Sequence, residues 1–243
     1  MSVIQIADLA FGYGNERNVI EQITLTINKG ESVGLIGANG VGKSTLLRLL
    51  VGLQSGYQGE LKIHSLSMEK KNLRKIREHV GYVFQDADSQ LFSATVGDDV
   101  AFGPRNYGYN KEEVERRVKK ALQQVHIEHL REKRVYQLSG GEKKMASIAT
   151  VLSMEPDIFI MDEPTNALDP RNRRNLITTL NGFSHLKILA SHDLDFIMDT
   201  CERTILLYEG KIIRDGKTQE ILRDKELLEQ HGLELPLRFY YQR

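Results

Sequence analysis

The segment from Gly37 to Thr45 restricts the possible folds of this chain more than any other part of it. It reads Gly-Ala-Asn-Gly-Val-Gly-Lys-Ser-Thr, with four residues between Gly37 and Gly42. This spacing is typical of a loop that wraps phosphate groups: glycines let backbone N–H groups point inward, a lysine reaches the outer phosphates, and a serine hydroxyl ligates magnesium. The predicted nucleotide contacts are Gly37, Asn39, Gly40, Gly42, Lys43, Ser44 and Thr45.

The flanks of this loop fit the same interpretation. Residues 31–36 read as a buried strand, and residues 44–50 read as a helix whose positive N-terminal end favours an anion. A glycine-rich turn that happens to precede a helix is the alternative. The complete pattern between a strand and a helix favours phosphate binding.

Composition indicates an ordinary globular protein of one or two domains. The chain has 243 residues, of which 40% are hydrophobic and 27% charged. Lys+Arg and Asp+Glu are both 33, and this zero net charge argues against a general nucleic-acid-binding protein. The one cysteine, Cys201, excludes an intrachain disulfide and suits a reducing compartment. No apolar run approaches the ~18 residues that span a bilayer, and no secretory segment is recognised, so we expect a soluble or peripheral protein.

Hydrophobic patterns predict an α/β fold. Residues 3–6 and 23–27 alternate apolar and polar side chains, as half-buried strands do. Further predicted strands are 60–63, 80–84, 157–161, 186–190 and 204–208, and predicted helices are 171–181, 193–200 and 217–231. Strands that alternate with helices indicate a mostly parallel sheet covered on both faces.

Residues 95–153 depart from this alternation. Residues 111–125 predict a helix whose apolar stripe is formed by positions 114, 118, 121, 122 and 125. We therefore expect a helical subdomain inserted into the α/β core.

Two carboxylates, Asp162 and Glu163, directly follow the predicted strand 157–161. Beside a phosphate loop, Asp162 is expected to hold magnesium through water, and Glu163 to polarise the water that attacks a terminal phosphate. Two surface acids after a strand are the alternative. The phosphate loop in the same chain favours the catalytic interpretation.

A second anion site is predicted at Leu138-Ser-Gly-Gly-Glu142, where a helix begins. A Ser-Gly-Gly turn at a helix N-terminus exposes N–H groups and a hydroxyl. One copy with a phosphate loop needs no second anion site. Two copies packed head-to-tail would each offer this turn to the terminal phosphate held by the other. A helix cap with a glycine turn is the alternative.

Together these motifs resemble those of the ATP-binding cassette (ABC) ATPases, over nearly the whole chain. They occur in the order of that family: Tyr13, Gly37–Thr45, Gln85, Leu138–Glu142, Ile158–Glu163, Asn166–Asp169 and His192. The resemblance implies a single ABC ATPase domain over residues 1–243. It would consist of a P-loop NTPase core (1–85 and 154–243) with a mostly parallel sheet, an N-terminal antiparallel β subdomain, and an inserted α-helical subdomain of approximately 86–153.

The resemblance also implies a role for each motif residue. Tyr13 would stack on adenine, Gln85 would reach magnesium and sense a transmembrane partner, and His192 would contact the γ-phosphate. Taken alone, Tyr13 reads as a turn tyrosine and His192 as a structural histidine. Asp169 would lie in the loop that crosses a dimer interface. The implied contacts to ATP on the opposing copy are Ser139, Gly140, Gly141 and Glu142.

The implied cofactors are ATP and Mg²⁺. The implied catalytic residues are Glu163, His192 and Gln85, and the implied magnesium ligands are Ser44, Gln85 and Asp162. GTPases carry an Asn-Lys-x-Asp motif that reads the base. The two Asn-Lys pairs of this chain, in 28–31 and 110–113, are each followed by Glu where that motif has Asp, which favours ATP.

The stretch Gln85–Pro104 resembles the ATPases of energy-coupling factor (ECF) transporters, which import vitamins and cobalt or nickel. Gln-Leu-Phe at 90–92 and Val-Ala-Phe-Gly-Pro at 100–104 carry this resemblance. The apolar side chains Leu91, Phe92, Val96, Val100 and Phe102 either pack the helical subdomain or form a patch that docks a helix of a membrane subunit. Met145 departs from the basic residue that the family often has there.

The resemblance implies the ATP-hydrolysing subunit of an ECF-type importer of a metal ion or a vitamin, at the cytoplasmic face of the cell membrane. Implied partners are integral membrane subunits, which couple energy and capture substrate, and a second ATPase, identical or paralogous. No nucleic-acid partner is expected. The alternatives are the ATPase of another ABC transporter type and a soluble ABC protein acting on DNA or ribosomes. The transported substrate is chosen by another polypeptide.

Overall fold

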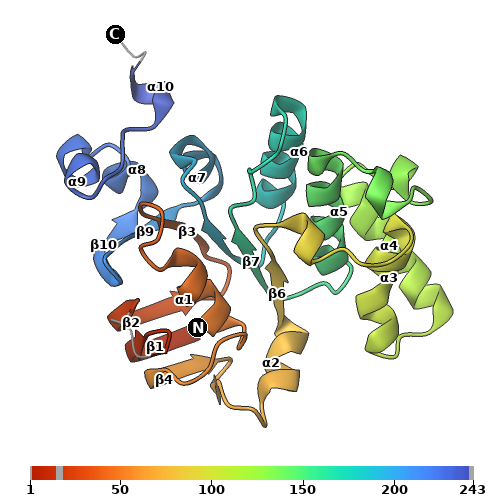
Figure 1. Ribbon diagram of the computed structural model, residues 1–243, viewed down its shortest axis with the longest axis horizontal. Helices are drawn as coiled ribbons and strands as arrows, with labels where there is room; N and C mark the ends of the chain where they lie inside the picture. Colours follow the sequence, from red (N-terminus) through yellow and green to blue (C-terminus); the bar gives the residue numbers. More distant parts are fainter. Residues whose placement is uncertain (1, 15–18, 241–243) are drawn as a thin grey trace.

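The computed structural model describes residues 2–14 and 19–240, and within them the strands form two sheets (Figure 1). The smaller sheet is antiparallel, with the order β2-β1-β4-β5. Its strands are β1 (Ser2–Phe11), β2 (Ile20–Asn28), β4 (Gln58–Ile63) and β5 (Leu66–Ser67). Buried apolar residues alternate with more exposed ones along β2, as in a sheet with one face on the core. The predicted antiparallel β region is confirmed.

The larger sheet has the order β10-β9-β3-β8-β7-β6 and is parallel except for β10. Its strands are β3 (Ser32–Ile36), β6 (Val80–Val83), β7 (Ile158–Asp162), β8 (Leu186–Ala190), β9 (Arg203–Tyr208) and β10 (Lys211–Lys217). Every residue of β7 and β8 is buried, as expected for strands covered on both faces. The prediction of a mostly parallel sheet is confirmed, whereas β10 was not predicted.

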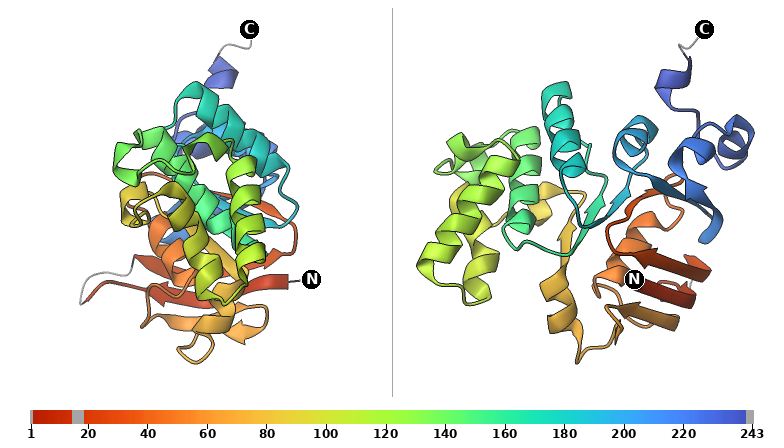
Figure 2. Two further views of the ribbon diagram at one scale, coloured as in Figure 1. Left: turned by 90° about the vertical axis from the view of Figure 1, so that its right-hand side faces the viewer. Right: turned by 180° about the vertical axis from the view of Figure 1, so that it is seen from behind.

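The helices occupy distinct parts of the molecule. One group of helices directly precedes or follows strands of the larger sheet in the sequence: α1 (Lys43–Leu50), α2 (Leu73–His79), α6 (Pro170–Asn181) and α7 (Leu194–Thr200). A second group contains α3 (Val96–Asn106), α4 (Lys111–Gln124) and α5 (Gly140–Leu152). The view from behind in Figure 2 shows this group and the antiparallel sheet at opposite ends of the molecule. Within the described residues, no helix is long and apolar enough to cross a membrane.

Helix α4 confirms the predicted helix 111–125, and its whole predicted stripe is buried. Helix α3 was not predicted as a separate element, because Gly97, Gly103 and Pro104 interrupt its pattern. The Thr95 hydroxyl starts α3 by accepting a hydrogen bond from the Asp98 N–H at 3.2 Å. A local cap therefore outweighs an unfavourable sequence pattern.

The predicted helix 217–231 is wrong in extent. The structure has two short helices, α8 (Thr218–Ile221) and α9 (Lys225–Gln230), and a further short helix, α10 (Leu237–Tyr240), follows. The Asp224 carboxylate accepts a hydrogen bond from the Leu227 N–H at 3.0 Å and is the N-cap of α9. Because an aspartate in this position starts a new helix, the regular run ends before it.

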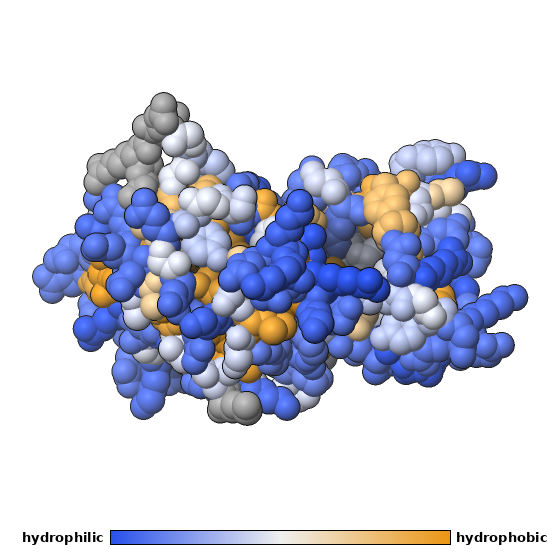
Figure 3. All heavy atoms as spheres, turned by 90° about the horizontal axis from the view of Figure 1, so that it is seen from below, coloured by the Kyte–Doolittle hydropathy of each residue, from blue (hydrophilic) through white to orange (hydrophobic). Residues whose placement is uncertain are grey.

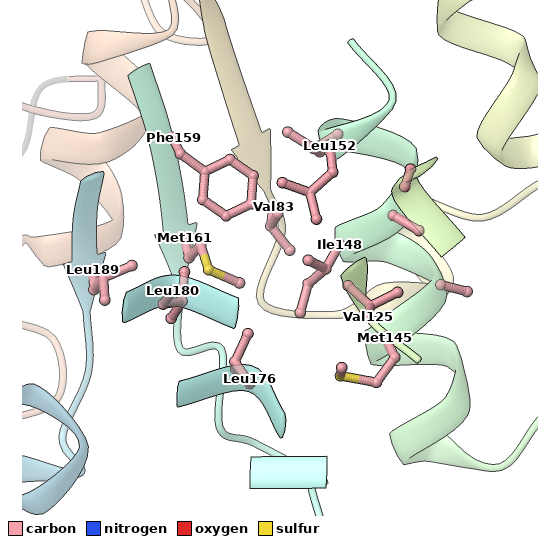
Figure 4. Packing of buried hydrophobic residues seen from close by; sticks show 14 of the residues in the cluster. Val83, Val125, Met145, Ile148, Leu152, Phe159, Met161, Leu176, Leu180 and Leu189 are labelled. Carbon is pink, nitrogen blue, oxygen red and sulfur yellow. The ribbon is translucent and has the colours of Figure 1, made fainter. Parts of the chain in front are cut away.

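The larger apolar core lies between the parallel sheet and helices α4, α5 and α6 (Figure 4). In Figure 4, Phe159 and Met161 of β7 point toward Ile148 and Leu152 of α5, with Val83 of β6 between them. Met145, which replaces a basic residue common in the family, is fully buried in this core. Its thioether side chain therefore fills apolar space behind the start of α5.

The structure buries three of the five large apolar side chains of 91–102 and exposes the other two. Leu91, Val96 and Val100 are buried and pack the helical group. Phe92 and Phe102 are 67% and 45% exposed, and their ring centroids lie 4.7 Å apart, edge to face. An aromatic pair therefore remains on the surface of this group.

Replacing Phe159 by alanine tests the role of this core. We expect Phe159→Ala to lower the free energy of unfolding by about 3–5 kcal/mol, because the side chain is 1% exposed and its removal leaves a cavity. Urea denaturation followed by circular dichroism measures the loss. The matched control, Phe92→Ala, should change stability by less than about 1 kcal/mol. Equal losses in the two variants would contradict the packing described above.

Candidate functional site

Loops that follow four parallel strands meet at one edge of the larger sheet. Residues 37–42 follow β3, Gln85 follows β6, Glu163 follows β7 and His192 follows β8. Because the carboxyl ends of parallel strands lie at the same edge, side chains far apart in sequence come together there. A cavity of about 340 Å³ is lined by Asn39, Gly40, residues 42–45, Gln85 and Glu163.

The loop after β3 requires glycine at two of its positions. Gly37 has φ +150° and Gly42 has φ +106°, which L-residues with a side chain rarely adopt. A Cβ atom on Gly37 would lie 2.3 Å from the Leu207 carbonyl oxygen, and one on Gly42 would lie 2.8 Å from the Val19 carbonyl oxygen. The loop is therefore pressed against β9 and the start of β2, with room for backbone only.

Lys43, the first residue of α1, places its ammonium back over this loop. Its Nζ donates hydrogen bonds to the carbonyl oxygens of Gly37 at 2.6 Å and Ala38 at 3.1 Å. Burial lowers the pKa of Lys43, while the charges of Glu163 and Asp162 act in the opposite direction. An anion at the loop would add a favourable partner for this partly desolvated charge.

Asp162, the last residue of β7, is 1% exposed and offers an unused acceptor. The Tyr82 hydroxyl donates to its Oδ2 at 3.3 Å, and Oδ1 has no hydrogen-bond partner among the described residues. Burial and the Asp162 charge both raise the pKa of Tyr82, which keeps that hydroxyl a donor. A buried carboxylate oxygen that has no hydrogen-bond partner among the described residues fits the preference of Mg²⁺ for oxygen ligands. Ser44 and Gln85, which also carry side-chain oxygens, line the cavity, whereas Asp162 does not.

Glu163 and His192 form a hydrogen-bonded pair across β7 and β8. Glu163 Oε2 lies 2.8 Å from His192 Nδ1, and it also accepts from the His192 N–H and the Ser191 hydroxyl at 3.3 Å. Because a carboxylate only accepts, Nδ1 of His192 carries the hydrogen. The Glu163 backbone is left-handed, with φ 46°, a strained conformation typical of functional positions. Glu163 lines the cavity, whereas His192 lines a different pocket, of about 520 Å³, and is joined to the cavity through its hydrogen bond to Glu163.

Tyr13 lies at the far end of the phosphate loop. Its hydroxyl is 3.3 Å from Thr45 Oγ1, and its ring packs edge to face on Phe11 with centroids 5.0 Å apart. The ring is 38% exposed, so one part of it is open to a planar ligand.

The Ser139–Glu142 turn does not line the cavity of its own chain. Ser139 caps α5: its hydroxyl accepts from the Glu142 N–H at 3.3 Å, and Glu142 accepts from the Ser139 N–H at 2.7 Å. Lys133 donates to both oxygens of Glu142 at 3.0 Å. Ser139 therefore does cap helix α5, as the alternative interpretation expected, and Ser139 and Gly140 are nevertheless exposed to solvent.

Asp169 lies next to this turn. A Cβ atom on Gly141 would be 4.0 Å from Asp169 Oδ2 and 3.3 Å from Asn172 Nδ2. The Asp169 carboxylate caps α6, accepting from the Arg171 N–H at 2.8 Å and the Asn172 N–H at 2.9 Å. The two helix starts, of α5 and α6, therefore form one exposed surface separate from the cavity.

Sequence reasoning missed Lys144, the charged residue that joins α5 to the Gln85 segment. Its side chain is buried, and its Nζ donates to the carbonyl oxygens of Phe84 at 2.8 Å and Gln85 at 3.1 Å. Burial lowers the pKa of Lys144 to about 8, while Asp162 and Glu163 act in the opposite direction. The available signal was a lysine placed one turn from the buried Ile148 of the same helix.

Gln90 was missed as well, and it makes a second link between the same segments. Its Oε1 accepts from the Phe84 N–H at 3.1 Å. Its Nε2 donates to Ser147 O and Thr150 Oγ1, each at 2.7 Å. The segment after β6 is therefore tied to α5 by two independent sets of hydrogen bonds.

Comparisons with known proteins agree with this geometry. Residues 20–166 match the family model described as ABC transporter. A Geobacter sulfurreducens protein, provisionally named an ABC transporter ATP-binding protein, is 49% identical over 235 residues, covering 97% of this chain and 94% of that one. The energy-coupling factor transporter ATP-binding protein EcfA of Carboxydothermus hydrogenoformans is 40% identical over 237 residues, covering 96% and 87%. The structure of CbiO1 from Clostridium perfringens, part of the ABC transporter complex CbiONQ, has a TM-score of 0.84 and 35% identity, covering 98% of each chain.

Replacing Lys144 by methionine tests its buried charge. In the folded protein its pKa is about 8, below the ordinary 10.5, so the charged form is disfavoured by folding. Wild-type stability, measured relative to Lys144→Met, should therefore rise by up to about 3 kcal/mol as pH increases from 8 to 10.5. Urea denaturation of both proteins across this pH range measures the difference between their free energies of unfolding. The other titrating groups are the same in both proteins, so their contributions cancel in this difference. Parallel stability curves would show that Lys144 is not desolvated.

Proposed function

This chain is a member of the ABC transporter family of ATP-binding ATPases, and from that premise we propose that it is the ATP-hydrolysing subunit of an energy-coupling factor importer. The observation that carries the ATPase part is the cavity lined by the phosphate loop, Gln85 and Glu163, whose carboxylate is hydrogen-bonded to His192. Support for the importer type comes from similarity to EcfA and to CbiO1. The cargo in this proposal is a metal ion such as cobalt or nickel, or a vitamin.

ATP binds at the phosphate loop in this proposal. Backbone N–H groups of residues 37–45 hold the phosphates, Lys43 neutralises the outer ones, and Tyr13 stacks on adenine. Ser44, Gln85 and Asp162 would hold Mg²⁺, the last through water. This assignment is supported by Asp162 Oδ1, which has no hydrogen-bond partner in the described part of the chain. When bound, the ion supplies positive charge that offsets charge on the phosphate oxygens.

Glu163 and His192 act at the terminal phosphate. Glu163 orients a water molecule, whose oxygen forms a bond to the γ-phosphorus while the bond to the bridging oxygen breaks, leaving ADP and phosphate. His192, held by Glu163 through Nδ1, would donate from Nε2 to a γ-phosphate oxygen when both ring nitrogens carry a hydrogen. Lys43 stabilises the charge that develops in the transition state.

Two ATP molecules lie between two copies, or between this chain and a paralogue, in the proposed active state. Ser139, Gly140 and Gly141 complete the cavity of the opposing chain, Glu142 holds their turn, and Asp169 lies at the interface. This composite arrangement is supported by the exposure of Ser139 and by its position outside the cavity of its own chain.

Residues 86–153 act as a helical subdomain that moves against a core of 1–85 and 154–243 when the dimer closes. Lys144 and Gln90 support this coupling, because they tie the segment at Gln85 to helix α5. Rotation of α5 would therefore carry the Gln85–Pro104 segment with it, and with it a bound membrane subunit.

The Phe92–Phe102 pair is the proposed contact with that integral membrane subunit. Exposed apolar side chains stand out against hydrophilic surroundings at the end of the molecule that carries α3–α5 (Figure 3). An amphipathic helix of a membrane subunit could bury both rings. In this proposal the protein is peripheral, at the cytoplasmic face of the membrane.

Two inactive variants can test the catalytic site and its shared character. Glu163→Gln removes the carboxylate that orients water, so kcat should fall by about 10²–10⁴-fold while ATP still binds. Ser139→Arg blocks the contact with the opposing ATP and should also abolish turnover. A mixture of the two should regain up to about one quarter of wild-type ATPase activity, because mixed dimers contain one intact site.

The steady-state release of phosphate measures all three samples. An inactive mixture, with both proteins folded and binding a fluorescent ATP analogue, would contradict a shared site. Near-normal turnover in Glu163→Gln would contradict the role of that carboxylate.

Phe92→Ala tests the docking surface. Tagged Glu163→Gln protein, held with ATP, should co-purify from native membranes with small polytopic subunits identified by mass spectrometry. Adding Phe92→Ala should reduce their recovery at least about tenfold, because an aromatic anchor is lost. The control Leu237→Ala removes a side chain of nearly the same exposure, 66% against 67%, on α10. Equal recovery with both variants would exclude Phe92 from the interface.

A further inference from the structure

A cluster of possible metal ligands lies outside the nucleotide cavity, at the opposite end of β6 and β7. It consists of His64, His79 and Asp157, whose ligand atoms all lie within 4.8 Å of one another. Asp157 Oδ2 is 2.6 Å from His79 Nδ1 and 4.0 Å from His64 Nε2. The two imidazole rings have centroids 4.9 Å apart. We propose that these three residues bind one divalent transition-metal ion of the zinc, cobalt and nickel class.

Backbone structure fixes each of the three ligands. Val80 of β6 pairs with Ile158 of β7, so His79 and Asp157 stand side by side, each one residue before the paired positions. His64 lies in the two-residue turn between β4 and β5, where its φ is 47°. The His64 N–H donates to Val3 O at 2.8 Å, which anchors the turn to β1. The three ligands therefore come from three segments held by sheet hydrogen bonds.

The donor set selects the class of ion. Two imidazole nitrogens and one carboxylate oxygen suit zinc, cobalt and nickel, whereas magnesium and calcium prefer oxygen ligands alone. Ligands about 2.0–2.2 Å from such an ion lie about 3.3 Å from one another in a tetrahedral site. The observed separations bracket this value, so rotamer adjustments bring the three atoms into position.

Solvent exposure and charge also bear on this site. The side chains of His64, His79 and Asp157 are 34%, 45% and 48% exposed, so an ion and its water ligands can reach them. Lys29 adds a positive charge near His64, which opposes a cation. The Asp157 carboxylate offsets that charge. A histidine–carboxylate hydrogen bond alone would account for His79 and Asp157, but it leaves the convergence of His64 unexplained.

Bound metal would join the antiparallel sheet to the starts of β6 and β7. Figure 1 shows α2 leading directly into β6, beside β7. The same two strands end at the segments of Gln85 and Glu163. The ion would thus clamp three segments at the base of the strands that carry the cavity, and would stabilise the folded chain. This inference does not rest on the proposed function.

Zinc binding to the untagged, chelator-treated protein tests the site. Isothermal titration with zinc chloride, in buffer without nucleotide or Mg²⁺, should show one ion bound per chain. His64→Gln, His79→Gln and Asp157→Asn should each lower the zinc affinity at least about tenfold. Zinc should raise the unfolding temperature of the wild type by several degrees and leave that of His79→Gln unchanged.

Two controls separate this cluster from other possible ligands. His129→Gln removes an exposed histidine elsewhere, and Glu163→Gln removes the carboxylate charge from the His192–Glu163 pair. Both should bind zinc as the wild type does. No zinc binding, equal binding by all the variants, or a loss confined to Glu163→Gln would each overturn the proposal. The three cluster variants change different segments, so a folding defect in one leaves the other two to decide.

Discussion

The parallel pairing of β3, β8, β7 and β6 is the constraint on which the site depends. Its register does not stop where the strands end. The Glu163 N–H donates to Ala190 O at 2.9 Å, and the Ser191 N–H donates to Leu35 O at 3.2 Å. These backbone hydrogen bonds extend the ladder into the loops and bring Glu163 and His192 side by side, where their side chains can form a hydrogen bond. The cavity is thus a product of sheet geometry.

Local signals made the phosphate loop and the parallel core predictable from the sequence. Gly37 and Gly42 adopt backbone conformations that favour glycine. β7 and β8 are mostly apolar because they are buried on both faces. Lys144 was out of reach because its partners, Phe84 and Gln85, are about sixty residues away, and only tertiary packing brings them together. The break between α8 and α9 depends on the N-cap Asp224, and the spacing of apolar residues carries no information about such a cap.

The sheet and helix α5 are connected by apolar contacts and by hydrogen bonds of buried polar side chains, and only the second kind requires a polar group to leave water. Phe159 and Ile148 contribute non-directional apolar contact, whereas Lys144 and Gln90 impose fixed donor–acceptor distances through hydrogen bonds. Burying the Lys144 ammonium carries a desolvation cost, and backbone carbonyls recover part of it. A charged link of this kind is a poor source of stability and a good source of specificity. It fixes one relative position of α5 and the Gln85 segment.

The cap at the start of α5 resolves an apparent conflict between two interpretations of Ser139. A hydroxyl has one hydrogen to donate and two lone pairs with which to accept. Capping uses one lone pair, because the Glu142 N–H is the donor. The hydrogen of the same hydroxyl is directed at the Glu142 carboxylate, and in the proposed dimer it would turn from this acceptor to a phosphate oxygen. In the proposed dimer, helix initiation would therefore use a lone pair of the Ser139 hydroxyl and anion recognition would use its hydrogen. Threonine is the other side chain that carries a hydroxyl at the same distance from the backbone.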